Sequence, residues 1–166
     1  MLIGKRFSGK IKLNPSRELE PEGKRKMSFN FTGTVSSGLG RATNTVRMQA
    51  PLLKTYFPQI SECYLGTINF ILDIAFQVRL PDIVTPPLAW HPSNPSGERF
   101  GITRIGLTLP NGEVHDAWIF TSEGSPHRFN DHLVEVVAKR INVAIGEKCV
   151  LTVGRVIQSA SGLYVV

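Results

Sequence analysis

The stretch GITRIGLTLPNGEVHDAWIFT, residues 101–121, predicts two antiparallel strands joined by a tight turn. Apolar and polar side chains alternate through 101–109 and again through 114–121, as in strands that bury one face. Pro110-Asn111-Gly112 makes a turn between them, and Asn111-Gly112 is a strong hairpin signal. The segment therefore predicts a β-hairpin.

Most of the remaining chain carries the same kind of signal. We expect further strands over residues 28–35, 67–73, 76–80, 148–153 and 155–157. Many short strands, frequent turn residues and little helix are typical of small barrels. The fold class predicted is mainly β, a small closed or semi-closed β-barrel with one or two short helices.

Two segments are candidates for helix. Residues 49–57 predict a short helix with Pro51 in its first turn, ending before the next proline. Residues 133–141 are ambiguous, because Asp131 can cap a helix whereas the valines that follow favour a strand.

Length and composition indicate one ordinary globular domain. The chain has 166 residues, 42% of them hydrophobic and 19% charged. No apolar run approaches the roughly 20 residues that cross a bilayer, and the first residues lack the apolar core of a secretory signal. We expect no membrane partner and a cytoplasmic location, with Cys63 and Cys149 as buried free thiols rather than a disulfide.

Positive charge is concentrated at the start of the chain. The net charge is +6, and residues 1–32 hold eight Lys and Arg against three Glu. We predict a basic N-terminal extension over 1–27 and a single barrel domain over 28–166. A basic arm can attract nucleic acid, but it also serves as a solvated lead-in. Nucleic acid is the less favoured partner, because no aromatic residues are interleaved for base stacking.

A proline-rich insertion interrupts the domain at residues 81–99. It contains five prolines, which exclude a paired interior strand. Two interpretations remain: an ordered loop pinned by Trp90, or a mobile lid over a substrate.

The segment Gly66-Thr67-Ile68-Asn69 predicts a cation site. In an extended chain, Thr67 and Asn69 point to one face. Two neutral oxygens on one face can hold Mg²⁺ and leave positions for water and phosphate oxygens. The alternative is a turn pair that opens a strand.

A glycine turn lies upstream of this segment, at Gly38-Leu39-Gly40. Glycines permit close backbone approach, so consecutive amide N–H groups can surround a phosphate. The turn has neither the Walker pattern nor the dinucleotide fingerprint. A plain hairpin is the alternative.

The order of these motifs resembles the archaeal-type CTP-dependent riboflavin kinases. The matching blocks are VSSGLG at 35–40, YLGTINFILD at 64–73, and SPH at 125–127 followed by LVEVVA at 133–138. The resemblance covers roughly residues 31–154. It implies a cradle-loop, riboflavin-kinase-like barrel and tips residues 133–141 to strand. It also implies phosphoryl transfer from CTP to riboflavin with Mg²⁺, giving FMN.

The resemblance assigns roles residue by residue. It implies that Thr67 and Asn69 hold Mg²⁺ and that Ser125 and His132 contact the flavin. The nucleotide-contacting residues that it implies are Gly38, Leu39, Gly40, Arg41, Ala42, Thr43, Lys139, Arg140, Ile141 and Asn142. Arg41 and Glu135 are the candidates for catalysis, as a charge neutraliser and a general base. His127 either contacts phosphate or flavin or fixes its loop.

The chain departs from the family at three positions. Arg41-Ala42 replace a Glu-Gly pair in the glycine turn, and His132 replaces a Glu. The first change reverses a charge beside the expected phosphates, and the second removes an acceptor-only carboxylate. These departures keep open a second interpretation, a non-catalytic nucleotide- or flavin-binding barrel. A basic-arm protein that interacts with nucleic acid is the third.

Overall fold

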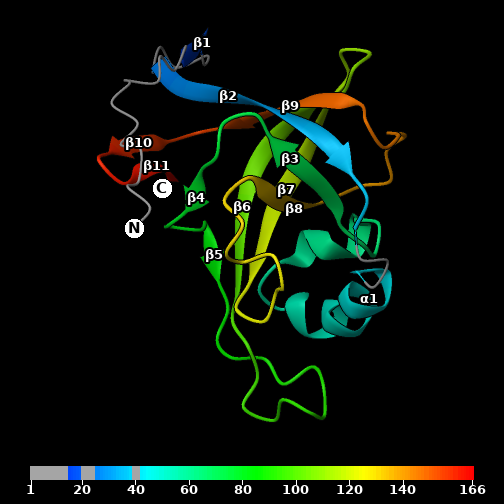
Figure 1. Ribbon diagram of the computed structural model, residues 1–166. Helices are drawn as coiled ribbons and strands as arrows, with labels where there is room; N and C mark the ends of the chain where they lie inside the picture. The colour runs from blue at the N-terminus through cyan, green and yellow to red at the C-terminus, as the bar shows by residue number, and fades with distance from the viewer. Residues whose placement is uncertain (1–14, 20–24, 39–41) are drawn as a thin grey trace, which may run out of the picture.

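A closed six-stranded barrel forms the centre of the molecule (Figure 1). The computed structural model describes residues 15–19, 25–38 and 42–166. Around the barrel the strands are β2 (Arg25–Ser36), β3 (Ile68–Leu72), β8 (Leu133–Ala138), β7 (Val114–Ser122), β6 (Phe100–Thr108) and β9 (Lys148–Val153). Every pair is antiparallel, and β9 pairs with both β6 and β2 to close the ring. The predicted mainly-β barrel is confirmed.

The long strand β2 makes closure possible, because its middle and its C-terminal end pair with different strands of the ring. Its middle pairs with β9, from Phe29 opposite Val153 to Thr34 opposite Lys148. Its end pairs with β3, from Gly33 to Ser36. A Cβ atom at Gly33 would lie 3.0 Å from both Leu151 and Phe70, so the crowded interior leaves no room for a side chain there.

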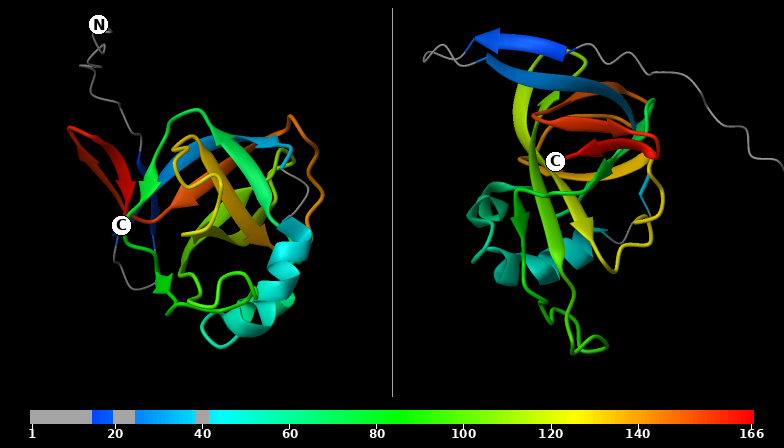
Figure 2. Two further views of the ribbon diagram at one scale, coloured as in Figure 1. Left: turned by 60° about the horizontal axis from the view of Figure 1, so that its bottom comes forward. Right: turned by 90° about the vertical axis from the view of Figure 1, so that its left-hand side faces the viewer.

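Side-chain alternation produces two apolar cores. Inward-facing residues such as Phe31, Phe70 and Leu107 fill the barrel. Outward-facing residues of β6, β7 and β8 are covered by helix α1 (Ala42–Leu53) and the 3-10 helix η1 (Pro58–Glu62). Phe57 packs edge-on against Trp118 there, with ring centroids 5.1 Å apart. Figure 2 shows α1 against the outside of the ring.

The helix begins earlier than the sequence predicts. It was expected over 49–57 with Pro51 in its first turn, whereas α1 spans Ala42–Leu53 and Pro51 lies near its end. A proline so close to the C-terminus removes one backbone hydrogen bond without interrupting the preceding turns. The amides of Tyr56 and Phe57 both donate to the Leu53 carbonyl, which closes the helix.

Short strands lie outside the barrel. β1 (Pro15–Leu19), which lies within the predicted N-terminal extension, pairs with the first residues of β2. β5 (Ile83–Val84) pairs with β6. β10 (Val156–Ser159), β11 (Gly162–Val165) and β4 (Gln77–Val78) form a separate three-stranded sheet beside the barrel (Figure 2). The ambiguous segment after Asp131 forms strand β8, as the resemblance implied.

The proline-rich insertion is an ordered loop pinned by Trp90. The Trp90 indole Nε1 donates to Glu98 Oε1 at 2.7 Å, and Leu88 forms a β-bridge with Glu98. Trp90 also packs against the outer core. None of its residues lines either pocket described below, so the prediction of a lid over the substrate gains no support.

Cys63 and Cys149 are buried free thiols, as predicted. In the part of the chain that the structure describes, no helix has the length and apolar character needed to cross a bilayer.

Candidate functional site

The strand pair β3–β8 contributes lining residues to two pockets, one at β3 and the end of β8 and the other at the start of β8. The first, which we call the Thr67 pocket, has a volume of about 250 Å³ and includes Ser36, Thr67 and Asn69 in its lining. The second, the Ser125 pocket, has a volume of about 410 Å³ and includes Ser125 and Glu135. The residues predicted for the metal and for one flavin contact therefore lie in different but adjacent pockets.

A row of three polar residues crosses the boundary between the pockets. Ser36 pairs with Asn69 across β2–β3, and Asn69 pairs with Glu135 across β3–β8. Directly paired residues of antiparallel strands lie on one face with Cβ atoms about 5 Å apart. Phe70 and Val134, their neighbours in sequence, point into the barrel core, so the polar row lies on the outer face.

Thr67 and Asn69 present their oxygens to each other. The Thr67 hydroxyl donates to Asn69 Oδ1 at 3.2 Å. Mg²⁺ bonds of about 2.1 Å at right angles place adjacent ligand oxygens about 3.0 Å apart. The pair therefore fits two neighbouring positions of one Mg²⁺ ion. Both residues line the Thr67 pocket, and Asn69 is only 5% exposed.

The described residues that flank 39–41 lie against the segment 66–69. A Cβ atom at Gly38 would lie 3.0 Å from Asn69 Nδ2, and one at Gly66 would lie 3.3 Å from the Thr43 hydroxyl. Ala42 begins α1, so the helix N-terminus follows the turn directly. The other predicted turn residues, Leu39, Gly40 and Arg41, lie outside the described residues.

Two basic side chains also belong to the lining of the Thr67 pocket. Lys139, Arg140 and Ile141 belong to its lining, whereas Asn142 does not. Lys139 Nζ forms an ion pair with Glu62 at 2.6 Å, and this hydrogen bond raises the pKa of Lys139. The Arg140 guanidinium lies 6.0 Å from the ring centroid of Tyr64, which also lines the pocket. Because the charge of Lys139 is already paired with Glu62, Arg140 is the better placed cation for a nucleotide in this pocket.

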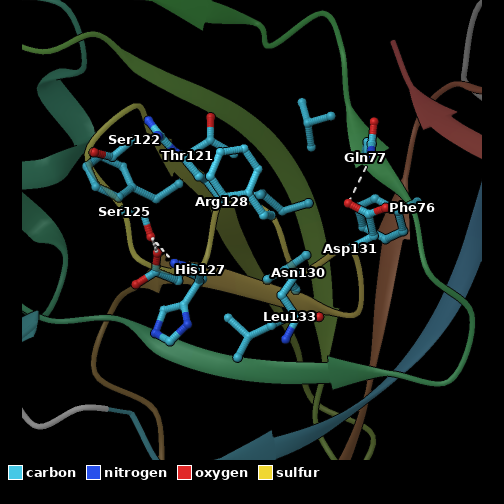
Figure 3. Close-up of a pocket in the computed structure, with 16 residues that line it drawn as sticks. Phe76, Gln77, Thr121, Ser122, Ser125, His127, Arg128, Asn130, Asp131 and Leu133 are labelled. Atoms are coloured by element: carbon cyan, nitrogen blue, oxygen red, sulfur yellow. Dashed lines mark hydrogen bonds between the residues drawn. The ribbon is translucent and has the colours of Figure 1, made fainter.

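The Ser125 pocket lies under the loop between β7 and β8 (Figure 3). The Ser125 hydroxyl donates to Glu135 Oε2 at 2.8 Å and accepts from the His127 amide at 3.2 Å. His127 itself lines the pocket, and its backbone contact supports the interpretation that it helps to fix the loop. On the far side, Gln77 donates to Asp131 at 2.9 Å, which ties β4 to the same loop.

His132 is not brought into either pocket. Its Nδ1 atom lies 3.0 Å from the Leu72 carbonyl oxygen, and its backbone amide donates to Asn130 Oδ1. These bonds hold the residue at the start of β8, beside the pocket lining rather than in it. Its flavin contact remains a prediction from the resemblance.

Sequence reasoning missed Ser36 and Tyr64 as pocket residues. Ser36 Oγ is buried and has no hydrogen-bond partner among the described residues. The signal that identifies it is its direct pairing with Asn69, which appears only when strand register is known. Tyr64 is an aromatic side chain that remains half exposed at the edge of the pocket.

No model of a known protein family matches the chain, and no curated protein matches it. The chemistry of the site is therefore argued from its geometry. Paired neutral oxygens, cations in the lining of the same pocket and a carboxylate at the boundary with a second pocket suit the transfer of a charged group between two bound molecules.

Proposed function

We propose that the chain is a CTP-dependent riboflavin kinase, which transfers the γ-phosphoryl group of CTP to riboflavin. The observation that carries the proposal is the pairing of Asn69 with Glu135. Through it, the predicted metal ligands and the carboxylate stand side by side, one in each pocket. The nucleotide belongs in the Thr67 pocket and riboflavin in the Ser125 pocket.

The reaction needs little covalent chemistry from the protein. The riboflavin 5′-hydroxyl oxygen forms a bond to the γ-phosphorus, the bond from that phosphorus to the β,γ-bridging oxygen breaks, and CDP leaves. Catalysis then rests on alignment of the two substrates and on neutralisation of charge. Thr67 and Asn69 would hold Mg²⁺, which would neutralise phosphate charge when bound.

Cations of this chain supply further neutralisation. Arg140 and Lys139 line the Thr67 pocket, and Lys139 shares its charge with the exposed Glu62 carboxylate. Charged hydrogen bonds from such groups to phosphate oxygens are the strong kind. Arg41, the other candidate from the sequence, lies outside the described residues.

Glu135 is the candidate to accept the proton of the attacking hydroxyl. It is half-buried, lines the Ser125 pocket and follows Asn69 directly across the strands. Ser125 donates to one of its oxygens and so fixes the carboxylate orientation, leaving the other oxygen for the substrate. A general base must lie within hydrogen-bond reach of the proton that it removes.

The test is to incubate the protein with riboflavin, Mg²⁺ and each of the four ribonucleoside triphosphates, and to separate the flavins by chromatography. We expect FMN to form with CTP and to depend on Mg²⁺. Absence of FMN with every nucleotide, for a folded protein, would reject the kinase. If CDP and FMN nevertheless bind in calorimetry, the chain is a binding module without turnover.

A further inference from the structure

Phe129 is the most exposed large apolar side chain among the described residues, at 82%. It lies on the loop between β7 and β8 and lines the Ser125 pocket. A single exposed apolar residue is common on protein surfaces, but this one stands in the lining of a pocket, where a bound ligand can cover its ring. The site roles assigned above make no use of Phe129.

The ring is supported from one side. The Arg128 guanidinium lies 4.5 Å from the Phe129 ring centroid and also donates to the Glu123 carbonyl oxygen. The loop backbone is closed by successive turns, among them Arg128 N to Ser125 O at 3.3 Å and Asn130 N to His127 O at 2.9 Å. A cation beside the ring, one turn that precedes Phe129 and one that contains it keep the ring at the pocket edge.

The remaining walls suit a flat, mainly apolar ligand with polar edges. Apolar lining residues come from β7, β8 and the segment before β4: Phe76, Ile119, Phe120, Leu133 and Val134. The polar groups stand at the two ends, as the Ser125–Glu135 pair and the Gln77–Asp131 pair, and Figure 3 shows Gln77 and Asp131 pointing toward each other from β4 and the loop. Aromatic rings prefer to meet such a surface in offset-stacked or edge-on geometry.

We propose that Phe129 stacks on a planar aromatic ring system bound in the Ser125 pocket and makes this pocket selective for aromatic ligands. The inference deepens the proposed function, on which it rests for the identity of the ligand: the ring system is the isoalloxazine of riboflavin. Phe129 positions the isoalloxazine ring, and the hydroxyl-bearing chain of riboflavin extends toward Glu135.

The test measures riboflavin binding by the quenching of flavin fluorescence. Phe129→Ala is expected to raise the Kd about tenfold, the effect of losing one stacking contact. Phe129→Trp, which keeps an aromatic face, should stay within about threefold of wild type. Tyr56→Ala is the matched control, because Tyr56 is a 39% exposed aromatic residue that lines neither pocket. The affinity for CDP should be unchanged in all three variants.

An unchanged riboflavin Kd in Phe129→Ala would overturn the inference and leave the kinase proposal standing. If the wild type does not bind riboflavin, the kinase proposal fails, and the same variants are titrated with proflavine, a planar aromatic dye unrelated to flavins. Proflavine binding that Phe129→Ala weakens about tenfold supports an aromatic site for another ligand. Proflavine binding that is absent, or equal in both proteins, overturns it.

Discussion

Asn69 is a buried amide on the outer face of a barrel strand, where alternation alone would predict a solvent-exposed side chain. The Gly38 backbone covers it, and a Cβ atom at this glycine would lie 3.0 Å from the amide nitrogen. The Thr67 hydroxyl satisfies its oxygen. Gly38 is therefore needed for close approach rather than for an unusual φ, and it packs directly against one of the two predicted metal ligands.

Replacing Asn69 with Ala should lower kcat of the proposed kinase by about two orders of magnitude. The variant loses one of the two oxygens that are proposed to hold Mg²⁺. Removal of one key electrostatic contact in other active sites lowers turnover by about this factor. Steady-state FMN formation measures it. Asn30→Ala is the control, because Asn30 is an exposed amide on β2 bonded to Thr152 away from the pockets. Equal turnover in wild type and Asn69→Ala would remove the metal role.

Gly124 is the residue that fixes the distance between the proline-rich insertion and the pocket loop. A Cβ atom there would collide with Glu98 Oε2, and Glu98 is held by Trp90 and has little room to move. Gly124→Ala should lower the free energy of unfolding by about 1–3 kcal/mol, the usual cost of overpacking. Urea unfolding measures it. Gly154→Ala is the control and should leave the free energy of unfolding unchanged, since nothing lies within 4 Å of a Cβ atom there. An unchanged free energy of unfolding in Gly124→Ala would show that Glu98 is free to shift.

At the scale of elements, η1 is followed by Cys63, and the reactivity of the Cys63 thiol reports how well this residue is buried. Burial, with a smaller contribution from the Glu62 carboxylate, raises the pKa of Cys63 from 9.0 to about 11, and Lys139 partly opposes this shift. Because the thiolate is the reactive form, alkylation of Cys63 in the native protein should be slow near pH 8 and should accelerate about tenfold per pH unit toward pH 11. Mass spectrometry after timed treatment with iodoacetamide measures the rate at each cysteine.

The same experiment on Glu62→Gln separates the causes of the shift. Removal of the carboxylate abolishes one repulsive charge and leaves Lys139 unpaired beside Cys63, so alkylation should begin at lower pH. The protein unfolded in guanidinium should react readily near pH 8. Rapid labelling of native Cys63 at neutral pH would contradict the burial described here.

Sequence predicted elements well where the signal is local. The Asn111-Gly112 turn is a hairpin with Gly112 at φ +88°, and β9 has the bounds that alternation gave. The start of α1 was missed because residues 42–48 lack an apolar stripe strong enough to override Thr and Asn, which are poor helix formers. Packing of Val46 under the barrel wall supplies the missing stabilisation. β1 was missed because it depends on β2 for its pairing.

At the scale of the molecule, the site depends on information that local patterns do not contain. Thr67 and Asn69 could be found from their two-residue spacing. The opposition of Asn69 to Ser36 and Glu135 requires the register of three strands that are distant in sequence, and register follows from the whole barrel. Phe129 carried no signal at all, since a single exposed aromatic residue in a loop has no periodicity.

The C-terminal hairpin illustrates such long-range dependence, because it supports the Ser125 pocket from outside the barrel. β11 pairs in parallel with β4, with Tyr164 opposite Gln77, and Leu163 and Val165 join the barrel core. Gln77 in turn donates to Asp131 on the pocket loop. Disturbing the hairpin should therefore loosen one pocket and leave the other intact.

Deletion of residues 156–166 should lower Tm and weaken riboflavin binding, while CDP binding persists.

Gln77→Ala tests the bond between β4 and the loop alone. Loss of this one exposed hydrogen bond should raise the riboflavin Kd about threefold to tenfold with little change in Tm. Gln158→Ala, an exposed glutamine on β10, is the matched control. Fluorescence quenching and calorimetry give the two affinities. If Gln77→Ala binds riboflavin as tightly as the wild type, the loop holds its shape without the bond to β4. If the variant weakens CDP binding as much as riboflavin binding, the two pockets do not respond separately.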